Sequence, residues 1–355
     1  MSIDELLQAK TSCWMDGSDR NSDVVISSRV RLARNLEGFP FPLALSETRS
    51  QEVAQKIKEA IDKAGTKSGD YEFVAMQDIT PLERFVLVER HLISPQHVEN
   101  PVGKGVAIRD DQAVSIMVNE EDHLRIQCLL PGLNLEKAWN TASNADDLLE
   151  GELDLAYDEK LGYLTCCPTN TGTGMRASAM VHLPALVMTN QVSKVLGLLP
   201  QLGLAVRGLY GEGSQALGNL FQISNQITLG QTETDIITNL SAVTKQIVDK
   251  EQETRQVLLR EAKEQLEDRV CRAYGTLANA RLMPGQEALS LLSDLCLGID
   301  LGIIPRLPAN VFTELIVTTS PAHLQYLSGR EMSAAIRDIE RAKIIRSRME
   351  AQAVD

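Results

Sequence analysis

Hydrophobic positions along the chain follow two periods, which divide it into a strand-rich first part and a helical second part. Residues 106–109, 113–118 and 123–130 are short apolar runs between polar turns, a spacing that predicts a meander of hairpins. The same pattern predicts further strands at residues 24–31, 163–166, 178–183, 204–207 and 220–224. Because the strands cluster and helical patterns flank them, the fold class is α+β, with a mostly antiparallel sheet rather than a doubly wound one.

Helical periodicity accounts for most of the remaining chain. It predicts helices at residues 47–63, 81–92, 135–149 and 191–202. From Thr232 the chain is nearly all helical, and Thr232 or Thr234 can cap a long helix that extends to about Ala280. We therefore predict a lead-in over residues 1–22, an α+β domain over 23–255 and a helical C-terminal domain over 256–355. The second boundary falls inside the long predicted helix.

Composition and charge exclude several classes of protein. With 43% hydrophobic and 23% charged residues, the chain is typical of ordered globular proteins. A net charge of −13 argues against a general nucleic-acid binder, which needs a cationic face. No apolar run approaches the ~20 residues of a membrane span, and residues 1–10 lack the layout of a signal peptide, so we expect a cytoplasmic protein. The six cysteines show neither disulfide-framework nor zinc-site spacing.

Five arginines stand at strand ends or in loops that one antiparallel sheet could bring together: Arg29, Arg31, Arg125, Arg176 and Arg207. Paired arginines on a strand more commonly face solvent. Five guanidinium groups in one pocket, however, repel one another unless a polyanion lies among them, and the planar fork of arginine suits phosphate oxygens. We therefore predict an arginine cage for ATP, with Mg²⁺ carried by the nucleotide and no metal bound directly by the protein.

Carboxylates on two different loops indicate the acceptor. A guanidinium substrate is cationic and a poor nucleophile, so two carboxylates would hold it best, one of them withdrawing a proton. Glu121 and Glu212 are the candidates, although a Glu-Glu-Asp turn is more often a hydrated hairpin. Cys167 precedes a Gly/Thr-rich loop, and neighbouring arginines would favour its thiolate, which could hold the third side of the substrate. A small buried hydrophobe is the plainer interpretation of this cysteine.

Four long motifs together resemble the phosphagen kinase family, which includes creatine and arginine kinases. They are Ser-Ser-Arg-Val-Arg at 27–31, Asn-Glu-Glu-Asp-His-Leu-Arg at 119–125, Cys-Pro-Thr-Asn-Thr-Gly-Thr-Gly-Met-Arg at 167–176 and Arg-Gly-x-x-Gly-Glu at 207–212. The resemblance spans residues 23–252. It implies a glutamine-synthetase-like catalytic fold that binds Mg-ATP, with Glu121 as base, Glu212 as its partner and Cys167 as reactive thiol. The nucleotide contacts that it implies are Ser27, Ser28, Arg29, Val30, Arg31, His91, Arg125, Arg176, Ala177, Ser178, Ala179, Met180, Arg207, Gly208, Leu209, Tyr210, Gly211 and Glu212.

The layout departs from that of small-molecule phosphagen kinases, which carry a helical domain before the first motif. Here only residues 1–22 precede it and a helical segment follows, as in the bacterial protein arginine kinases of the same family. Spacing alone favours a solvated helix with internal ion pairs around Arg337, Asp338 and Arg341. The resemblance instead implies a phosphoarginine-binding regulatory element formed by Arg337, Asp338, Arg341 and Ala342, with the arginines on phosphate and Asp338 on the guanidinium.

We therefore expect a transferase that moves the γ-phosphate of ATP to arginine side chains of proteins. The resemblance also implies a role in the stress response, with a heat-shock repressor and unfolded proteins as substrates, and with a Clp-type ATPase and a zinc-binding activator protein as partners. A homodimer is expected, although apolar tail positions serve a core or an interface equally well. The alternatives are a kinase of free arginine or another small guanidino compound, and a non-catalytic phosphoarginine-binding adaptor.

Overall fold

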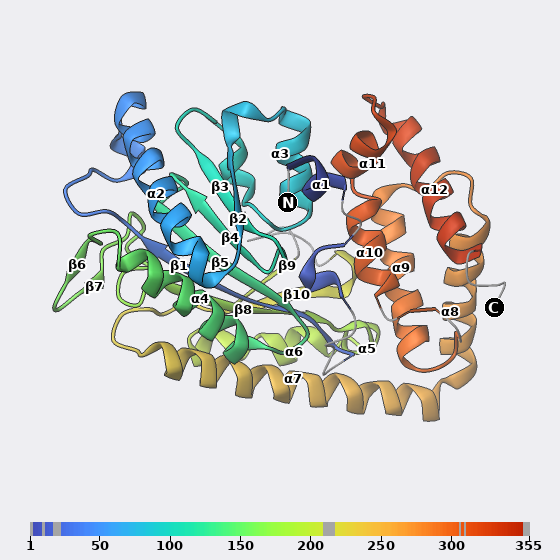
Figure 1. The fold of residues 1–355 in the computed structure, drawn as a ribbon. Helices are drawn as coiled ribbons and strands as arrows, with labels where there is room; N and C mark the ends of the chain where they lie inside the picture. The colour runs from blue at the N-terminus through green and yellow to red at the C-terminus, as the bar shows by residue number, and fades with distance from the viewer. Residues whose placement is uncertain are drawn as a thin grey trace.

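A single antiparallel sheet forms the centre of the molecule in the computed structural model, which describes residues 3–8, 11–16, 23–208, 217–304, 307–308 and 310–350 (Figure 1). The sheet has eight strands in the order β2-β3-β4-β5-β1-β8-β10-β9, and each neighbouring pair is antiparallel. The predicted α+β class is confirmed. The strands are β1 (Val25–Arg34), β2 (Tyr71–Ala75), β3 (Gly105–Arg109), β4 (Val114–Val118), β5 (Leu124–Pro131), β8 (Met175–His182), β9 (Leu204–Gly208) and β10 (Leu220–Asn225).

One predicted strand is wrong in length. Of residues 163–166, only Tyr163 lies in a strand, within a small separate hairpin of β6 (Tyr157–Asp158) and β7 (Gly162–Tyr163). The chain leaves the ladder because the backbone N–H of Cys166 donates to the Asp122 carboxylate at 2.7 Å instead of to another strand. A side-chain acceptor can replace a ladder partner in this way and so end a strand early.

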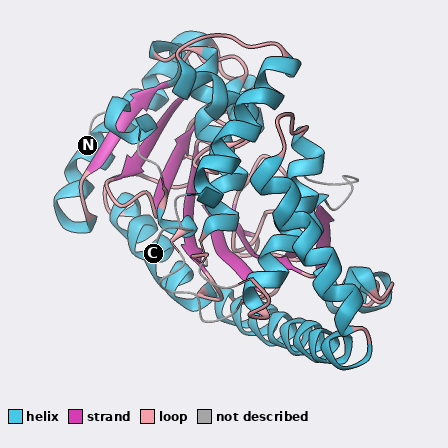
Figure 2. Cartoon of the chain, turned by 90° about the vertical axis from the view of Figure 1, so that its right-hand side faces the viewer, coloured by secondary structure: helices cyan, strands magenta, loops and turns pink. Residues whose placement is uncertain are grey.

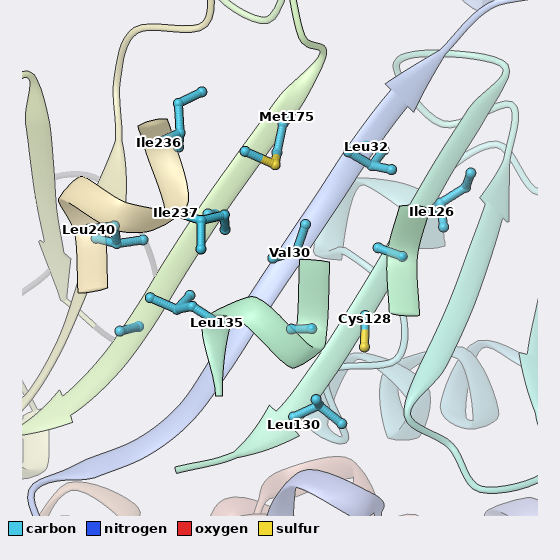
Figure 3. Packing of buried hydrophobic residues seen from close by; sticks show 14 of the residues in the cluster. Val30, Leu32, Ile126, Cys128, Leu130, Leu135, Met175, Ile236, Ile237 and Leu240 are labelled. Atoms are coloured by element: carbon cyan, nitrogen blue, oxygen red, sulfur yellow. The ribbon is translucent and has the colours of Figure 1, made fainter. Parts of the chain in front are cut away.

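Three helices cover one face of the sheet: α2 (Glu47–Ser68), α4 (Leu135–Glu150) and α7 (Glu233–Glu261). Figure 3 shows Leu135 of α4 and Leu240 of α7 in the same cluster of buried side chains as Val30 and Leu32 of β1. Because strand side chains alternate between faces, burial of Val30 and Leu32 against these helices directs Arg29 and Arg31 to the opposite face. The hydrophobic core thus decides which face of the sheet carries the arginines.

The C-terminal helices group at one side of the sheet, as Figures 1 and 2 show. They pack against the sheet through a second core in which Ile26, Leu129 and Leu220 of three strands meet residues such as Leu292 and Phe312. None of the described helices is long and apolar enough to cross a bilayer. The remaining helices are α1 (Ile3–Gln8), α3 (Pro81–Glu89), α5 (Pro184–Met188), α6 (Val192–Leu196), α8 (Lys263–Asn279), α9 (Gly285–Asp300), α10 (Val311–Thr318), α11 (Pro321–Ser328) and α12 (Ala334–Glu350).

Two predicted helices differ from the structure. Thr232 caps the long helix as expected, with its hydroxyl accepting from the backbone N–H of Asp235, but the helix breaks at Ala262 (φ −141°, ψ 38°). The α7 helix is continuous through residues 255 and 256, where the domain boundary is predicted. The helix itself does not mark that boundary, which stays a prediction. The expected helix over 191–202 consists of α6 and a 3₁₀ turn at Leu199–Leu202, because Pro200 lacks an N–H and cannot donate the α-helical hydrogen bond to the residue four before it.

A buried ion pair fastens the sheet to α4. Arg34, the last residue of β1, donates to the Asp146 carboxylate at 2.6 Å, and the exposed fractions of the two side chains are 2% and 6%. The same guanidinium donates to the backbone oxygen of Thr173 at 3.1 Å and lies 3.4 Å from the centre of the Tyr163 ring. Arg34 therefore joins a strand, a helix and the loop that contains Cys167.

Replacing Asp146 by alanine should destabilise the protein strongly, because it leaves a buried guanidinium without its counter-charge. We expect Asp146→Ala to lower the free energy of unfolding by about 3–5 kcal/mol, measured by urea denaturation. Asp62→Ala is the matched control, since it breaks an exposed Lys58–Asp62 pair on α2, and it should cost about 0.5 kcal/mol or less. Equal losses in the two variants would show that the Arg34 pair has no special structural role.

Candidate functional site

Strand register brings the predicted arginines to one face of the sheet. Arg31 of β1 lies directly opposite Arg176 of β8. Arg207 of β9 lies opposite Gln222 of β10, and Arg125 enters from β5 on the other side of β1. Four strands that are adjacent or nearly adjacent in the sheet therefore supply the five arginines, although the sequence separates Arg29 from Arg207 by most of the α+β part.

Mutual repulsion shows that these guanidinium groups are close together. Burial, followed by the charges of Arg125 and Arg207, lowers the pKa of Arg29 to about 10. Burial also lowers the pKa of Arg31 well below its usual value, with further lowering by Arg29, Arg125 and Arg176. The pKa of Arg176 is lowered by burial and by the charges of Arg207 and Arg125. Cations held this close are unfavourable in the protein alone.

A polyanion fits this cluster. The Nε atoms of Arg31 and Arg176 are buried and meet no hydrogen-bond acceptor among the residues that the structure describes. A buried donor without an acceptor carries an uncompensated desolvation cost, which is larger for a charged group. Phosphate oxygens would satisfy both donors and offset the repulsion, because each presents several lone pairs to a guanidinium fork.

A narrow pocket opens beside the arginines. It is lined by Ser27, Arg29, His91, Ser178 and Met180, all of which the sequence predicts as nucleotide contacts, together with Leu129 and Gln222. The last two were missed. Gln222 lies opposite Met180 in the pairing of β10 with β8, and Leu129 lies opposite Arg29 in the pairing of β5 with β1. Predicting these two residues requires the strand register, which the sequence pattern does not give.

His91 contributes no positive charge to this pocket at neutral pH. Burial and the nearby charge of Arg29 lower the pKa of His91 to about 4. Its backbone is held in the left-handed region (φ 59°), its carbonyl accepts from the Gln127 amide at 2.8 Å, and its ring meets Trp14 edge-on. A rigid neutral ring at this position suits contact with an uncharged part of a ligand.

The side chains of four predicted nucleotide contacts point away from the pocket, so their contact with a nucleotide stays a prediction. The side chains of Val30, Ala177 and Ala179 belong to the core between the sheet and its helices, because they occupy the alternate positions of β1 and β8. The Ser28 hydroxyl donates to the Gly132 carbonyl and accepts from the backbone N–H of Asn134. These four side chains stabilise the fold beneath the pocket and do not line it.

Acidic residues at the turn before β5 meet the arginines directly. The Arg125 guanidinium contacts Glu120 at 2.9 Å and Glu121 at 2.8 Å. Burial alone would raise the pKa of Glu120, but Arg125 and a hydrogen bond from the Ser94 hydroxyl hold that pKa below its usual value. The Glu121 side chain is 41% exposed, so its carboxylate faces an accessible space. Glu120 was not among the predicted site residues.

Asp122 fixes the distance between this turn and the loop that contains Cys167. Its Oδ1 accepts from the Cys166 N–H and from the Asn35 amide, both at 2.7 Å, and burial raises its pKa. The charges of Glu121 and Cys167 both act on Arg176, which shows that these three groups share one region. The Cys167 thiol is partly buried and lies 3.1 Å from the Thr169 hydroxyl.

Part of the predicted site lies outside the described residues. Leu209, Tyr210, Gly211 and Glu212 fall in the segment 209–216, whereas Arg207 and Gly208 end β9. The second carboxylate of the clamp therefore stays a prediction. Asn170, which accepts a 3.4 Å hydrogen bond from Arg176, is a further polar group at the site that the sequence did not single out.

The predicted regulatory element lies on α12. Arg341 is buried and donates to the backbone oxygens of Thr319 and Met283 and to Asp338 at 2.6 Å, while Ala342 is buried in the second core. The internal ion pair of the plainer interpretation is thus present between Asp338 and Arg341. Arg337 is partly exposed. Phosphoarginine binding at these four residues stays a prediction.

Glu89, the last residue of α3, links the α+β part to α11 of the C-terminal helices. Its carboxylate accepts from the backbone N–H groups of Ala322 and His323 at the start of α11, both at 2.8 Å. Burial raises the pKa of Glu89 to about 7, whereas these hydrogen bonds and the charges of Arg337 and Arg341 act to lower it. Only Arg90 separates Glu89 from His91 in the pocket.

Comparison with known proteins identifies both parts of the chain. Residues 52–254 match the family described as "ATP:guanido phosphotransferase, C-terminal catalytic domain". Residues 263–355 match "Protein-arginine kinase McsB C-terminal domain". The protein-arginine kinase of Halothermothrix orenii is 50% identical over 98% of this chain and 99% of its own length. That of Moorella thermoacetica is 52% identical over 95% of this chain and 97% of its own.

Solved structures agree with this relationship. A lombricine kinase is similar with a TM-score of 0.56 and 25% identity, covering 67% of this chain and 70% of its own. The duplicated taurocyamine kinase from Schistosoma mansoni, with bound transition-state-analogue components, gives a TM-score of 0.57 and 26% identity over 70% of this chain and 38% of its own. The catalytic-domain family matches more than half of the chain, and the two relatives are about 50% identical over nearly all of it. The chain therefore belongs to the ATP:guanido phosphotransferase family, in its protein-arginine kinase branch.

Proposed function

We propose that this protein transfers the γ-phosphate of ATP to the guanidinium group of arginine side chains in proteins. The observation that carries the proposal is the gathering of five partly buried, mutually repelling arginines beside the accessible carboxylate of Glu121. The cage suits a triphosphate and the carboxylate suits a cationic acceptor. The names of the relatives, protein-arginine kinases, favour a protein-bound arginine over a free one.

In this proposal the arginines and the carboxylate have separate tasks. The arginine cage would neutralise and align the phosphates, and such positioning supplies most of the catalysis in phosphoryl transfer. Glu121 uses one oxygen to accept from Arg125, which leaves the other for a substrate N–H, so it can orient the acceptor and take its proton. Cys167 and the predicted Glu212 would hold the remaining sides of the guanidinium.

Mg²⁺ would be held by the nucleotide and not by the protein. The carboxylates nearest the cage are already engaged, Glu120 by Arg125 and Ser94, and Asp122 by Asn35 and Cys166. When bound, the ion would supply positive charge to the phosphate oxygens and help to orient them. The protein's own share is the guanidinium groups that surround those oxygens.

The wider setting follows from the family resemblance. We propose a cytoplasmic enzyme of the stress response that acts on a heat-shock repressor and on unfolded proteins marked for a Clp-type ATPase. A zinc-binding activator protein would control it, and the C-terminal helices would form a homodimer. Arg337 and Asp338 would bind phosphoarginine and regulate the enzyme, with the Glu89 contact to α11 as the physical link to the catalytic part.

Glu121→Gln should abolish most of the transfer while leaving the fold intact. The carboxamide keeps the shape but cannot accept a proton, so we expect kcat to fall by about 10²–10⁴-fold. The measurement is phosphoarginine formation on an unfolded protein, followed by ³¹P NMR at neutral pH because the P–N bond is acid-labile. Glu136→Gln on α4 is the control. Full activity of Glu121→Gln would rule out this carboxylate as the base.

Arg31→Met should stabilise the free protein and weaken nucleotide binding. The folded-state pKa of Arg31 lies below its unfolded value, so folding disfavours its charge at neutral pH and the substitution removes that cost. We expect the free energy of unfolding to rise by about 1–2 kcal/mol and the thermal shift on adding Mg-ATP to disappear. The exposed Arg49→Met should change neither. A variant with lower stability and a normal ATP shift would contradict the cage.

Arg337→Ala should weaken phosphoarginine binding at α12. The loss of a charge-assisted contact predicts an affinity about tenfold lower or worse in calorimetry, performed with saturating ATP so that the catalytic cage is occupied. Lys343→Ala, an exposed cation on the same helix, is the matched control. Equal affinities of both variants and the unsubstituted protein would remove the proposed regulatory site.

A further inference from the structure

A second, larger cavity lies beside the β6–β7 hairpin. It has a volume of about 540 Å³ and is bounded by the hairpin, the end of α4, residues 172–173 and residues 228–233 at the start of α7. We call it the hairpin groove. Its size falls in the range of ordinary ligand sites, and neither the arginine cage nor the carboxylate turn contributes to its lining. The proposed transfer reaction leaves it without a role.

The wall of the hairpin groove is part of the loop that bears Cys167. Gly172 and Thr173 line the groove, and Gly172 is only five residues from Cys167, at most ~17 Å of extended chain. The Thr228 hydroxyl, on the facing wall, lies 2.9 Å from the carbonyl of Thr169 and 2.8 Å from that of Thr171. An extended polypeptide with its arginine beside Cys167 therefore reaches the groove within a few residues.

Gly172 keeps this wall close to its neighbour. Its φ is +114°, and a Cβ at this position would lie 2.6 Å from the Thr228 carbonyl oxygen, closer than real side chains come to backbone. Its own carbonyl accepts from the Tyr163 N–H at 2.9 Å. The hairpin, the Cys167 loop and the start of α7 thus form one fixed surface.

The chemistry of the hairpin groove matches a basic, partly apolar chain. Glu150, Glu159 and Glu233 line it, opposed by one lysine, Lys160. Tyr157 is 59% exposed, and two further lining residues, Leu161 and Leu229, are also exposed. Exposed aromatic and aliphatic groups between carboxylates suit lysine and arginine side chains, whose apolar stems and cationic heads can use both surfaces.

We propose that the hairpin groove binds the residues that flank the target arginine in a protein substrate, and that it selects basic flanks. This inference rests on the proposed function and adds to it a determinant of substrate choice. The bound segment is extended polypeptide, because the groove continues from the loop of Cys167 instead of enclosing a separate ligand. Free arginine has no flanks and gains nothing from the groove.

The test compares acceptors with and without flanks. The variant Glu150→Gln/Glu159→Gln/Glu233→Gln is assayed with a synthetic peptide carrying one arginine between lysines, the same peptide with glutamates in place of lysines, and free arginine. We expect KM for the lysine-flanked peptide to rise roughly fivefold to twentyfold and to lose its salt dependence, since three exposed charge pairs are removed. Values of kcat, KM for ATP and KM for free arginine should stay unchanged.

Matched controls separate this effect from a change of net charge. Glu253→Gln/Glu261→Gln/Glu264→Gln removes the same charge from exposed positions; Glu253 is twenty helical residues, about 30 Å, along α7 from Glu233. It should leave every constant as in the unsubstituted protein. Tyr157→Ser should raise KM for the lysine-flanked peptide without altering KM for free arginine, which gives a second test independent of the carboxylates.

The outcomes distinguish two failures. If the unsubstituted protein phosphorylates neither peptide nor any unfolded protein, the proposed function fails. If it phosphorylates the lysine-flanked peptide and the groove variant does so with the same KM, the function stands and the groove proposal is overturned. A parallel rise in KM for free arginine would also overturn it, because the substitutions would then act on the catalytic centre.

Discussion

Repulsion among five guanidinium groups is the constraint on which the site depends. Such a cluster is stable only where the surrounding fold supplies enough cohesion to hold the charges in place. Hydrophobic packing on the opposite face of the same strands provides this cohesion, because Val30 and Leu32 share a core with residues of α4 and α7. Core and cage thus occupy the two faces of the same strands. The free protein holds mutually repelling charges whose repulsion a bound triphosphate would relieve.

Two sets of buried polar contacts fix the loops of the proposed catalytic site to the sheet. Arg34 joins β1 to α4 and to the Thr173 carbonyl, while Asp122 joins the turn before β5 to the Cys166 backbone. Of these two side chains, Asp122 also meets the cage, because its carboxylate lies 3.8 Å from the Arg125 guanidinium. Both are almost fully buried, so each link is strong and neither can be replaced by water. Glu121 and Cys167 owe their shared position to them.

Much of this arrangement could be predicted from the sequence, because period-two alternation places Arg29 and Arg31 on one face and long motifs identify the loops. The helix break at Ala262 could not, because no proline or glycine at that position signals it. The burial of Arg341 depends on carbonyls of Thr319 and Met283, and the pocket position of Gln222 depends on strand register. Such partners are distant in sequence, so no local pattern reveals them.

Three consecutive residues show how the C-terminal helices can influence the pocket. Glu89 caps α11, Arg90 donates to the Leu6 carbonyl, the Ser12 hydroxyl and Gln112, and His91 lines the pocket. The guanidinium of Arg90 is buried and its pKa is lowered to about 10, so its acceptors cannot be lost without large cost. A shift of α11 must therefore either break the Glu89 cap or move His91 with it. If an anion bound at Arg337, as proposed, it would offset the positive charge that acts on Glu89 and so would bear directly on the Glu89 cap.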